Sequence, residues 1–177
     1  MIDGMLGVDT ASFDIIDVAL PLTPETAAKL KHGDIVRLTG VVYTARDAAH
    51  KRLTEALAKG ESLPFDIEGQ TIYYAGPAPA KPGHIIGPCG PTTSSRMDAY
   101  TPTLIKAGLR GMIGKGERSA EVRDAMREYG AVYFGVVGGA AALIARNVKR
   151  CDLVAYEDLG TEAIRRLEVE GLTAVVL

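Results

Sequence analysis

The second half of the chain alternates between short apolar segments typical of buried strands and longer segments with helical periodicity. The expected strands are residues 84–86, 111–114, 131–137 and 151–156, separated by expected helices at residues 95–107, 119–129 and 139–148. The first of these helices is expected to be disturbed at Pro102. Neighbouring parallel strands need a long crossover, most often a helix, whereas antiparallel neighbours need only a short turn. The alternation therefore predicts parallel strands joined by helical crossovers.

The first half is richer in β-forming residues and is expected to add a second sheet or a barrel-like layer. Its expected strands are residues 34–45 and 70–75, with Gly40 as a bulge or a point of close approach. Thr23 and Pro24 are typical of a helix start, and further elements are expected at 47–59 (helix), 163–169 and 172–177 (closing strands). The fold class predicted is mixed α/β, with one domain over residues 1–177 and a flexible terminus at 1–12.

Composition excludes several classes of protein. The formal net charge is −2 and no long basic run occurs, which argues against nucleic-acid binding. No apolar stretch reaches membrane-spanning length, and the first twelve residues do not resemble a signal peptide. With Cys89 and Cys151 as the only cysteines, a disulfide framework is not expected, and a reducing, cytoplasmic location is the default.

The segment from Gly87 to Asp98 reads Gly-Pro-Cys-Gly-Pro-Thr-Thr-Ser-Ser-Arg-Met-Asp. Glycine and proline fix a tight backbone path, and hydroxyl groups and an arginine follow at the start of an expected helix. Backbone N–H groups, hydroxyls and a guanidinium aimed at one point suit a carboxylate or phosphate oxygen. The segment therefore favours an anion site, although a rigid loop ending in a helix cap would use similar residues.

Three cationic residues stand at the boundaries of expected elements rather than within them. Arg46 ends a strand, Arg96 lies in the first turn after the Thr-Thr pair, and Lys115 follows a short buried strand between two glycines. Ligand crevices of α/β sheets lie beyond the carboxyl ends of the strands. The three side chains are thus candidates to bind a small dianion, although solvated surface charge is the commoner role of lysine and arginine.

No complete catalytic group accompanies these cations. His32, His50 and His84 lack neighbours at metal-ligand spacing, so solvated or core histidines are the expected reading and no metal site is predicted. Cys89 is interpreted as a small buried residue, with a reactive thiol as the alternative. Two cysteines cannot hold an iron–sulfur cluster, and the glycines at 135, 138 and 139 do not form a dinucleotide fingerprint. Such a site would bind and orient a substrate, and the catalytic group would have to come from elsewhere.

The motifs of the chain, from about Leu20 to the C-terminus, resemble the beta subunit of iron–sulfur class I hydro-lyases. This family comprises class I fumarate hydratase and L(+)-tartrate dehydratase. The resemblance is carried mainly by Arg46-Asp47-Ala-Ala-His50-Lys51-Arg52, Gly90-Pro91-Thr92-Thr93-x-x-Arg96-Met97-Asp98, Gly114-Lys115, Gly138-Gly139-Ala140-Ala141 and Glu157-Asp158-Leu159-Gly160-x-Glu162-Ala163.

The resemblance implies a swivelling β/β/α domain with a mixed or parallel sheet, docked on a larger alpha subunit. No cofactor is expected on this chain, because the 4Fe-4S cluster would belong to the alpha subunit, in an alpha2beta2-type assembly. By the same resemblance Arg46, Arg96, Lys115 and Thr93 would bind the substrate carboxylates. Thr92 would be the catalytic hydroxyl that moves the carbon-bound proton, although an unperturbed threonine hydroxyl is a poor base.

Asp47, His50 and Asp98 match the family motifs, and they are predicted either to support the site or to serve in helix capping and local ion pairing. The leading expectation is the reversible hydration of fumarate to L-malate, a tricarboxylic acid cycle reaction, with no activity from this chain alone. Ser95 and the Gly116-Glu117-Arg118 segment depart from common family patterns, which leaves tartrate open as the substrate. Two further hypotheses are a non-catalytic assembly module and a free dicarboxylate-binding module.

Overall fold

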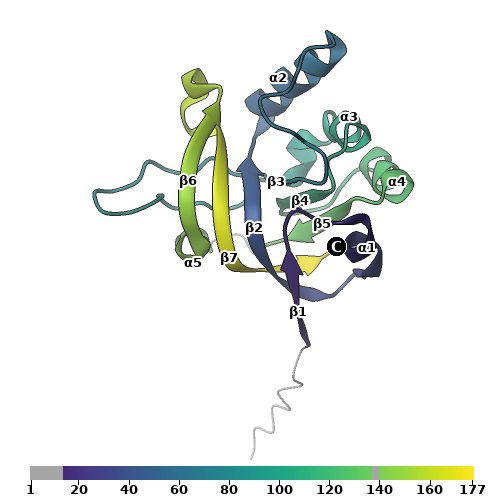
Figure 1. Ribbon diagram of the computed structural model, residues 1–177, viewed down its shortest axis with the longest axis horizontal. Helices are drawn as coiled ribbons and strands as arrows, with labels where there is room; N and C mark the ends of the chain where they lie inside the picture. Colours follow the sequence, from purple (N-terminus) through teal and green to yellow (C-terminus); the bar gives the residue numbers. More distant parts are fainter. Residues whose placement is uncertain (1–13, 137–139) are drawn as a thin grey trace, which may run out of the picture.

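The computed structural model describes residues 14–136 and 140–177. The predicted flexible terminus, residues 1–12, lies outside the described residues, as do Val137, Gly138 and Gly139. The chain forms one seven-stranded sheet in the order β1-β2-β3-β4-β5-β7-β6, with helices packed against it (Figure 1). The strands are β1 (Ile15–Ala19), β2 (Ile35–Thr44), β3 (Thr71–Tyr73), β4 (Gly111–Gly114), β5 (Val132–Gly135), β6 (Val148–Ala155) and β7 (Ile164–Val176).

The sheet is mixed, and it closes on itself through its last strand. Strands β1 to β5 pair in parallel with one another in chain order. Strand β7 runs antiparallel to β2 along most of its length, and its final residues also pair with β5. A closed ring is therefore formed by β2, β3, β4, β5 and β7. Strand β6 pairs with the first half of β7, outside the ring. The α/β class, with its parallel core, is confirmed.

The helices follow the strands as crossovers. They are α1 (Pro24–Lys29), α2 (Asp47–Ala58), α3 (Thr101–Lys106), α4 (Ala120–Tyr129) and α5 (Ala141–Asn147), with 3-10 turns at Ser94–Met97 and Glu157–Glu162. Helices α2, α3 and α4 lie together on one side of the ring (Figure 1). Across the described residues, no helix combines the length and the apolar character needed to cross a membrane.

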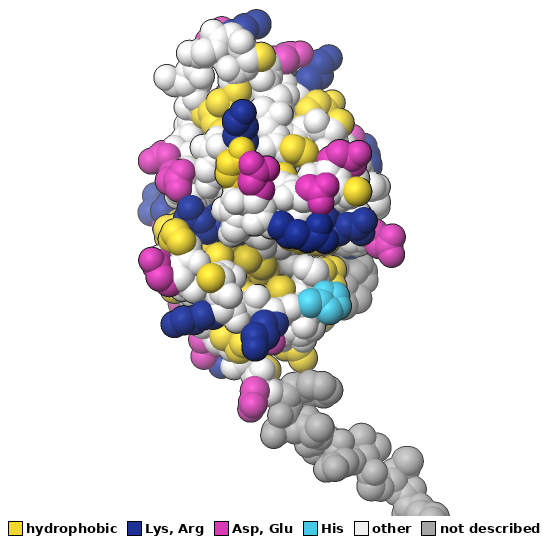
Figure 2. Space-filling model, turned by 90° about the vertical axis from the view of Figure 1, so that its right-hand side faces the viewer, with side chains coloured by type: hydrophobic (Ala, Val, Ile, Leu, Met, Phe, Trp, Pro, Cys, Tyr) yellow, Lys and Arg dark blue, Asp and Glu magenta, His cyan; other side chains and the backbone are white. Residues whose placement is uncertain are grey.

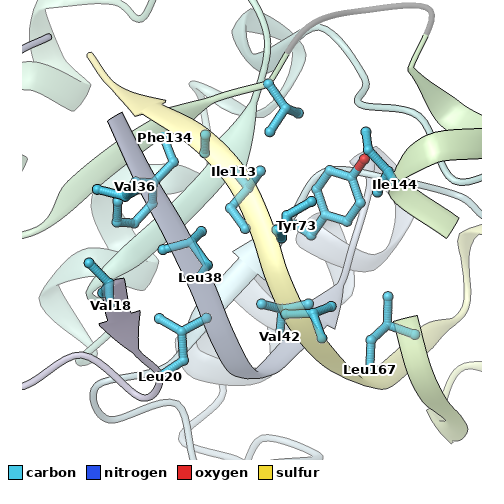
Figure 3. Packing of buried hydrophobic residues seen from close by; sticks show 14 of the residues in the cluster. Val18, Leu20, Val36, Leu38, Val42, Tyr73, Ile113, Phe134, Ile144 and Leu167 are labelled. Carbon is cyan, nitrogen blue, oxygen red and sulfur yellow. The ribbon is translucent and has the colours of Figure 1, made fainter. Parts of the chain in front are cut away.

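Two hydrophobic cores lie on the two faces of the strands. The first fills the interior of the ring with side chains such as Val36, Leu38, Tyr73, Ile113 and Phe134, which point toward one another (Figure 3). The second lies between the outer face and helices α2, α3 and α4. Tyr73 belongs to the first core and its neighbours Ile72 and Tyr74 to the second, as the two-residue period of a strand requires.

Several local expectations are confirmed. The Thr23 side chain accepts a hydrogen bond from the Thr26 N–H at 3.1 Å and caps α1. Ser119 caps α4 in the same way, and Gly130 ends that helix in the left-handed conformation. At Gly40 the pairing of β2 with β7 shifts register, φ is +137°, and an added Cβ would lie 2.9 Å from Leu20 Cβ. Gly40 thus marks both a bulge and a close approach.

Other local predictions are wrong. Residues 95–107 do not form one helix but a 3-10 turn followed by α3. The disturbance expected at Pro102 is confirmed, since this proline lies in the first turn of α3. Residues 84–86 form no strand in this described stretch, since prolines and glycines flank them on both sides. Gly171 does not divide two strands, because β7 continues through it with φ at +64°. Strands β6 and β7 are antiparallel rather than parallel.

Candidate functional site at the carboxyl edge of the parallel strands

Three neighbouring parallel strands bring the predicted residues to one edge of the sheet. Strand β2 pairs with β3, and β3 pairs with β4, so their carboxyl ends lie side by side. Arg46 lies two residues after the end of β2, and Lys115 follows β4 directly. The long connection after β3 carries Thr92, Thr93 and Arg96. The edge is the place where parallel α/β sheets bind ligands.

Backbone hydrogen bonds join these loops beyond the strand ends. The Thr92 N–H donates to the Tyr74 carbonyl at 2.6 Å, and the Ser94 N–H donates to the Lys115 carbonyl at 2.9 Å. Thr93 and Lys115 form a parallel bridge that extends the pairing of the sheet. The Thr-Thr segment is therefore held against the lysine by main-chain contacts rather than by side chains alone.

Arg96 contacts the start of α2 through Asp47. Its Nε lies 3.0 Å and its Nη2 lies 2.8 Å from Oδ2 of Asp47, and the two residues are 49 positions apart in the chain. The side chains remain 49% and 34% exposed, so solvent screens the pair. Asp47 lies in the first turn of α2, as the helix-terminus alternative expects, but its ion pair is long-range rather than local. The pair connects the Thr-Thr loop to the residue next to Arg46.

Arg46 has a looser ion pair. Its Nε lies 3.7 Å from Oε1 of Glu162, which is within ion-pairing range but too long for a hydrogen bond. This Nε is buried and has no hydrogen-bond partner among the described residues. Gly76 leaves space for the arginine, because a Cβ added there would lie 3.1 Å from Arg46 Cδ and 2.9 Å from the Thr161 carbonyl oxygen.

Glu162 is a site residue to which sequence reasoning gave no role. It lies in the second 3-10 turn, which a hydrogen bond of 2.8 Å from Arg52 Nη1 to Asp158 Oδ1 ties to α2. Arg52, Asp158 and Glu162 all fall within the family motifs, and this was the one signal in the sequence that could have pointed to Glu162. A separation of more than one hundred residues between Arg46 and Glu162 prevented their pairing from being foreseen.

His50 supports Arg46 from within α2. Its Nδ1 lies 2.8 Å from the Arg46 carbonyl oxygen, so Nδ1 carries the hydrogen and donates it. The side chain is fully buried, and this burial lowers the pKa of His50 to about 4. The ring is therefore neutral at pH 7, and Nε2 is an acceptor without a partner among the described residues. Asp47 Oδ1 is a second buried acceptor of the same kind.

Lys115 is exposed, and its ammonium forms no ion pair within residues 14–136 and 140–177. Thr93 is exposed and Thr92 is half-buried.

Asp98, by contrast, contacts Arg118 at 2.8 Å and accepts a hydrogen bond from the Ser119 N–H at 2.9 Å. The structure thus joins Arg46, Asp47 and Arg96 in one group, joins Thr93 and Lys115 in another, and connects the two groups through residues 93–96.

The remaining candidates are two histidines and one cysteine. His32 and His84 are exposed, and Cys89 is fully buried, as the sequence predicted. Burial raises the pKa of Cys89 to about 12, which makes a reactive thiolate there unfavourable. Within the described residues, no group of three His, Cys, Asp or Glu side chains is placed to hold a metal ion.

We call the edge that carries Arg46, Arg96 and Lys115 the cationic edge. Two hollows elsewhere on the surface are lined by other residues. One, of about 360 Å³, is lined by residues of α1, the end of α4 and the C-terminus. Figure 2 shows hydrophobic side chains gathered below a row of Lys and Arg on the face that carries α1 and α4. The other, of about 650 Å³, lies between α5 and residues 78–88. Neither is lined by Arg46, Arg96 or Lys115. At the cationic edge itself, Thr93, Lys115 and Arg96 are exposed to solvent.

Chemically, the edge combines three cations with two carboxylates and two threonine hydroxyls. Guanidinium groups bind carboxylates through two parallel hydrogen bonds, and an ammonium adds a point charge. The arrangement can hold and orient a small dianion from one side.

Comparisons with known proteins identify close relatives. The sequence model of a family described as Fumarase C-terminus matches residues 7–177. The chain is 44% identical over 142 residues to the aerobic class I fumarate hydratase of Salmonella typhimurium, covering 79% of this chain and 24% of that protein. It is 40% identical over 159 residues to fumarate hydratase 1, mitochondrial, of Leishmania major, covering 87% of this chain and 29% of that protein.

A third relative has nearly the same length. The chain is 41% identical over 161 residues to a provisionally named L(+)-tartrate dehydratase subunit beta of Methanocaldococcus jannaschii, covering 88% of this chain and 83% of that protein. By contrast, the chain spans about a quarter of the length of the bacterial fumarate hydratases that it matches, 24% and 26% in two cases.

Proposed function

The chain belongs to the Fumarase C-terminus family, and on that premise we propose that it is the beta-type half of a hydro-lyase acting on a four-carbon dicarboxylate. The reaction is the reversible addition of water across a carbon–carbon double bond, with fumarate and L-malate as the leading pair. The observation that carries the proposal is the gathering of Arg46, Arg96 and Lys115 at one edge of β2, β3 and β4.

In this proposal the three cations bind the two substrate carboxylates. Lys115 is supported for this role by its exposure and by the lack of an ion pair among the described residues. Arg46 is supported by its buried Nε, which has no hydrogen-bond partner in the described chain. Arg96 would exchange Asp47 for a substrate carboxylate or share it, which costs little because a half-exposed pair contributes only about 0–1 kcal/mol. Thr93 would add a hydroxyl beside Lys115.

We assign proton transfer at carbon to Thr92. Its main chain is fixed by the hydrogen bond to the Tyr74 carbonyl, and it lies one residue from the Thr93–Lys115 bridge. The base would have to be the threonine alkoxide, and a threonine hydroxyl is too weakly acidic to form it in water. The nearby cations would have to stabilise the alkoxide in a site from which water is excluded. This requirement is a further reason to propose that another subunit covers the edge.

We propose an alpha subunit as that partner, in line with the word "subunit" in the name of the Methanocaldococcus relative. The 4Fe-4S cluster of this class of enzymes does not fit the present chain. It needs three or four thiolates, whereas this chain has two cysteines, one of them fully buried with a raised pKa. We therefore assign the cluster to the alpha subunit, in an alpha2beta2-type assembly. Because both thiols are free, the proposal keeps the cytoplasmic location expected from the sequence.

Tartrate is the second candidate substrate. The relative that matches this chain over most of its own length is named for L(+)-tartrate dehydratase, whereas the fumarate hydratases are much longer proteins. L(+)-Tartrate has the same pair of carboxylates, so the same three cations would bind it. The substrates differ in their hydroxyl groups, for which no selective contact stands out at this edge.

The test is to co-produce this chain with its alpha partner and to assay the complex without oxygen on fumarate, L-malate and L(+)-tartrate. In Arg96→Ala the loss of a charged hydrogen-bonding partner should lower kcat/KM by at least a hundredfold, equal to about 2.7 kcal/mol. Arg37→Ala is the matched control. Arg37 is also half-exposed, at 48%, and forms an ion pair of 2.9 Å with Asp17, but it lies near the start of β2, at the opposite end of the strand from Arg46. This control should keep full activity.

The proposal fails if the assembled complex turns over none of the three dicarboxylates, or if Arg96→Ala remains fully active. A complex that assembles normally and shows equal turnover in the wild type and in Lys115→Ala would instead support the non-catalytic assembly module. Measurable dicarboxylate binding by the chain without its partner would support the free binding module.

A further inference from the structure

Arg118 is the one Lys, Arg, Asp or Glu residue that is buried within residues 14–136 and 140–177. Its side chain is only 2% exposed, although the residue follows the exposed loop of Lys115. Burying a guanidinium is unfavourable unless hydrogen bonds and an opposite charge replace its water. A position that keeps such a residue needs an explanation from its contacts.

Each nitrogen of the Arg118 guanidinium donates at least one hydrogen bond. Its Nε donates to Asp98 Oδ1 at 2.8 Å, its Nη1 to the Tyr74 hydroxyl at 3.0 Å, and its Nη2 to Thr101 Oγ1 at 2.8 Å. Its central carbon also lies 5.1 Å and 5.0 Å from the ring centroids of Tyr74 and Tyr133. A lysine could supply the charge but not this fixed fork of donors.

The contacts of Arg118 reach the two segments that carry the substrate-binding candidates, one directly and one through Tyr133. Asp98 ends the 3-10 turn that contains Arg96, and it also accepts the Ser119 N–H at 2.9 Å. Tyr133, under the guanidinium, donates to the Gly116 carbonyl and hydrogen-bonds Ser94, both at 2.7 Å. The loop of Lys115 and the turn of Arg96 are thus connected through one buried cluster, which we call the Arg118 cluster: Tyr74, Ser94, Asp98, Thr101, Arg118 and Tyr133.

We propose that Arg118 is a positioning residue for the hydration reaction, which fixes Lys115 and Arg96 at a constant separation. The inference rests on the proposed function, because it concerns the geometry of the same site. Arg118 is buried beneath the edge and acts through the two loops rather than on the substrate itself. A fixed separation matters because a dicarboxylate has a fixed length, and a misplacement of about 1 Å can cost about a hundredfold in rate.

The variants that test this are Arg118→Lys, which keeps the charge but loses the fork, and Asp98→Asn, which removes the opposite charge at nearly constant volume. Both are measured in the assembled complex, per folded molecule. Their matched controls are Arg127→Lys and Asp124→Asn, since Arg127 and Asp124 form an ion pair of 2.9 Å that is 73% exposed. We expect the cluster variants to lower kcat/KM by about a hundredfold and the controls to leave it unchanged.

A double-mutant cycle separates positioning from a purely structural role. If Arg118 acts by placing Lys115, Arg118→Lys should cost much less in a Lys115→Ala background than in the wild type. Independent, additive losses would overturn the proposal. Should Arg118→Lys not fold, Tyr133→Phe takes its place, since it removes only the hydroxyl that bonds Gly116 and Ser94.

A failure of the proposed function can be told apart from a failure of this inference. If the wild-type complex is inactive on every dicarboxylate, amide hydrogen exchange in the full chain still tests the cluster. The Ser94 and Ser119 amides, bonded to Lys115 and Asp98, should lose protection in Arg118→Lys and keep it in Arg127→Lys. Unchanged protection of both amides in Arg118→Lys would overturn the inference.

Discussion

Gly114, the last residue of β4, offers a stringent test of how the edge is built. A Cβ added at this position would overlap Ser94 Oγ and lie 2.7 Å from Cδ2 of Tyr74. Both neighbours are fully buried and hydrogen-bonded, Ser94 to Tyr133 and Tyr74 to Arg118, so neither can move freely. Gly114→Ala must therefore push the Ser94 turn away from β4.

The stability cost follows from the contacts. Adding a methyl group to a filled core costs about 1–3 kcal/mol, and about 1 kcal/mol of this is the hydrogen bond that Ser94 gives up if it rotates. The functional cost follows from the displacement. Ser94 donates to the Lys115 carbonyl, and Arg96 lies in the same turn, so a shift of about 1 Å separates the two cations and should cost about a hundredfold in kcat/KM.

Gly111, the first residue of the same strand, provides the control. A Cβ there would overlap Thr71 Oγ1 and lie 3.0 Å from Thr71 Cβ, which is a clash of similar severity at the opposite end of β4. Denaturant unfolding should show comparable losses of stability for both variants, whereas anaerobic turnover per folded complex should fall only in Gly114→Ala. Equal losses of turnover in the two variants would refute the reasoning, since the effect would then reflect general destabilisation.

Two further predictions concern buried titratable groups. In the unfolded chain His50 takes up a proton at its ordinary pKa of 6.5, whereas in the folded chain its pKa is lowered to about 4. As the pH falls from 6.5 to 4, this residue should therefore lower the free energy of unfolding by about 3 kcal/mol. Denaturant titrations should show a flatter pH dependence for His50→Asn than for His32→Asn or the wild type, and equal slopes would contradict this. Cys89, with its pKa raised to about 12 by burial, should react with iodoacetamide at pH 8 far more slowly than the half-buried Cys151. Mass spectrometry of the labelled chain checks this order, which equal labelling rates would exclude.

The meeting of the candidate residues at one edge of the sheet was predictable from the sequence because strand ends are local features. Arg46 and Lys115 each follow an apolar, β-forming segment, and the pairing of parallel neighbours then places both at one edge. The Gly-Pro-Thr-Thr segment was predictable for a similar reason, since glycine and proline limit the backbone wherever they occur. The helix starts at Thr23 and Ser119 depend on side chains only three residues away.

The contacts that organise the site were not predictable, because they join distant parts of the chain. Arg96 meets Asp47 across 49 residues, and Arg118 looks in sequence like one more surface charge after Lys115-Gly116-Glu117. Only the packing of Tyr74 and Tyr133 around it reveals that it is buried. The error at residues 84–86 has a similar origin, since Ile86 is buried against the first core without joining the sheet.

The charges at the edge favour an assembly in which the proposed dicarboxylate binds well only after the proposed partner subunit covers the edge. Arg96 and Arg46 already face the carboxylates of Asp47 and Glu162, and these side chains remain between 25% and 49% exposed. Two charges 4 Å apart attract by about 1 kcal/mol in water but by about 4 kcal/mol where the effective dielectric constant falls to about 20. On the open edge a dianion would displace Asp47 at little cost, but it would gain equally little from Arg96, so its net affinity would be low. Covering the edge would strengthen every contact to the substrate, and for this reason affinity and catalysis should appear together, on assembly.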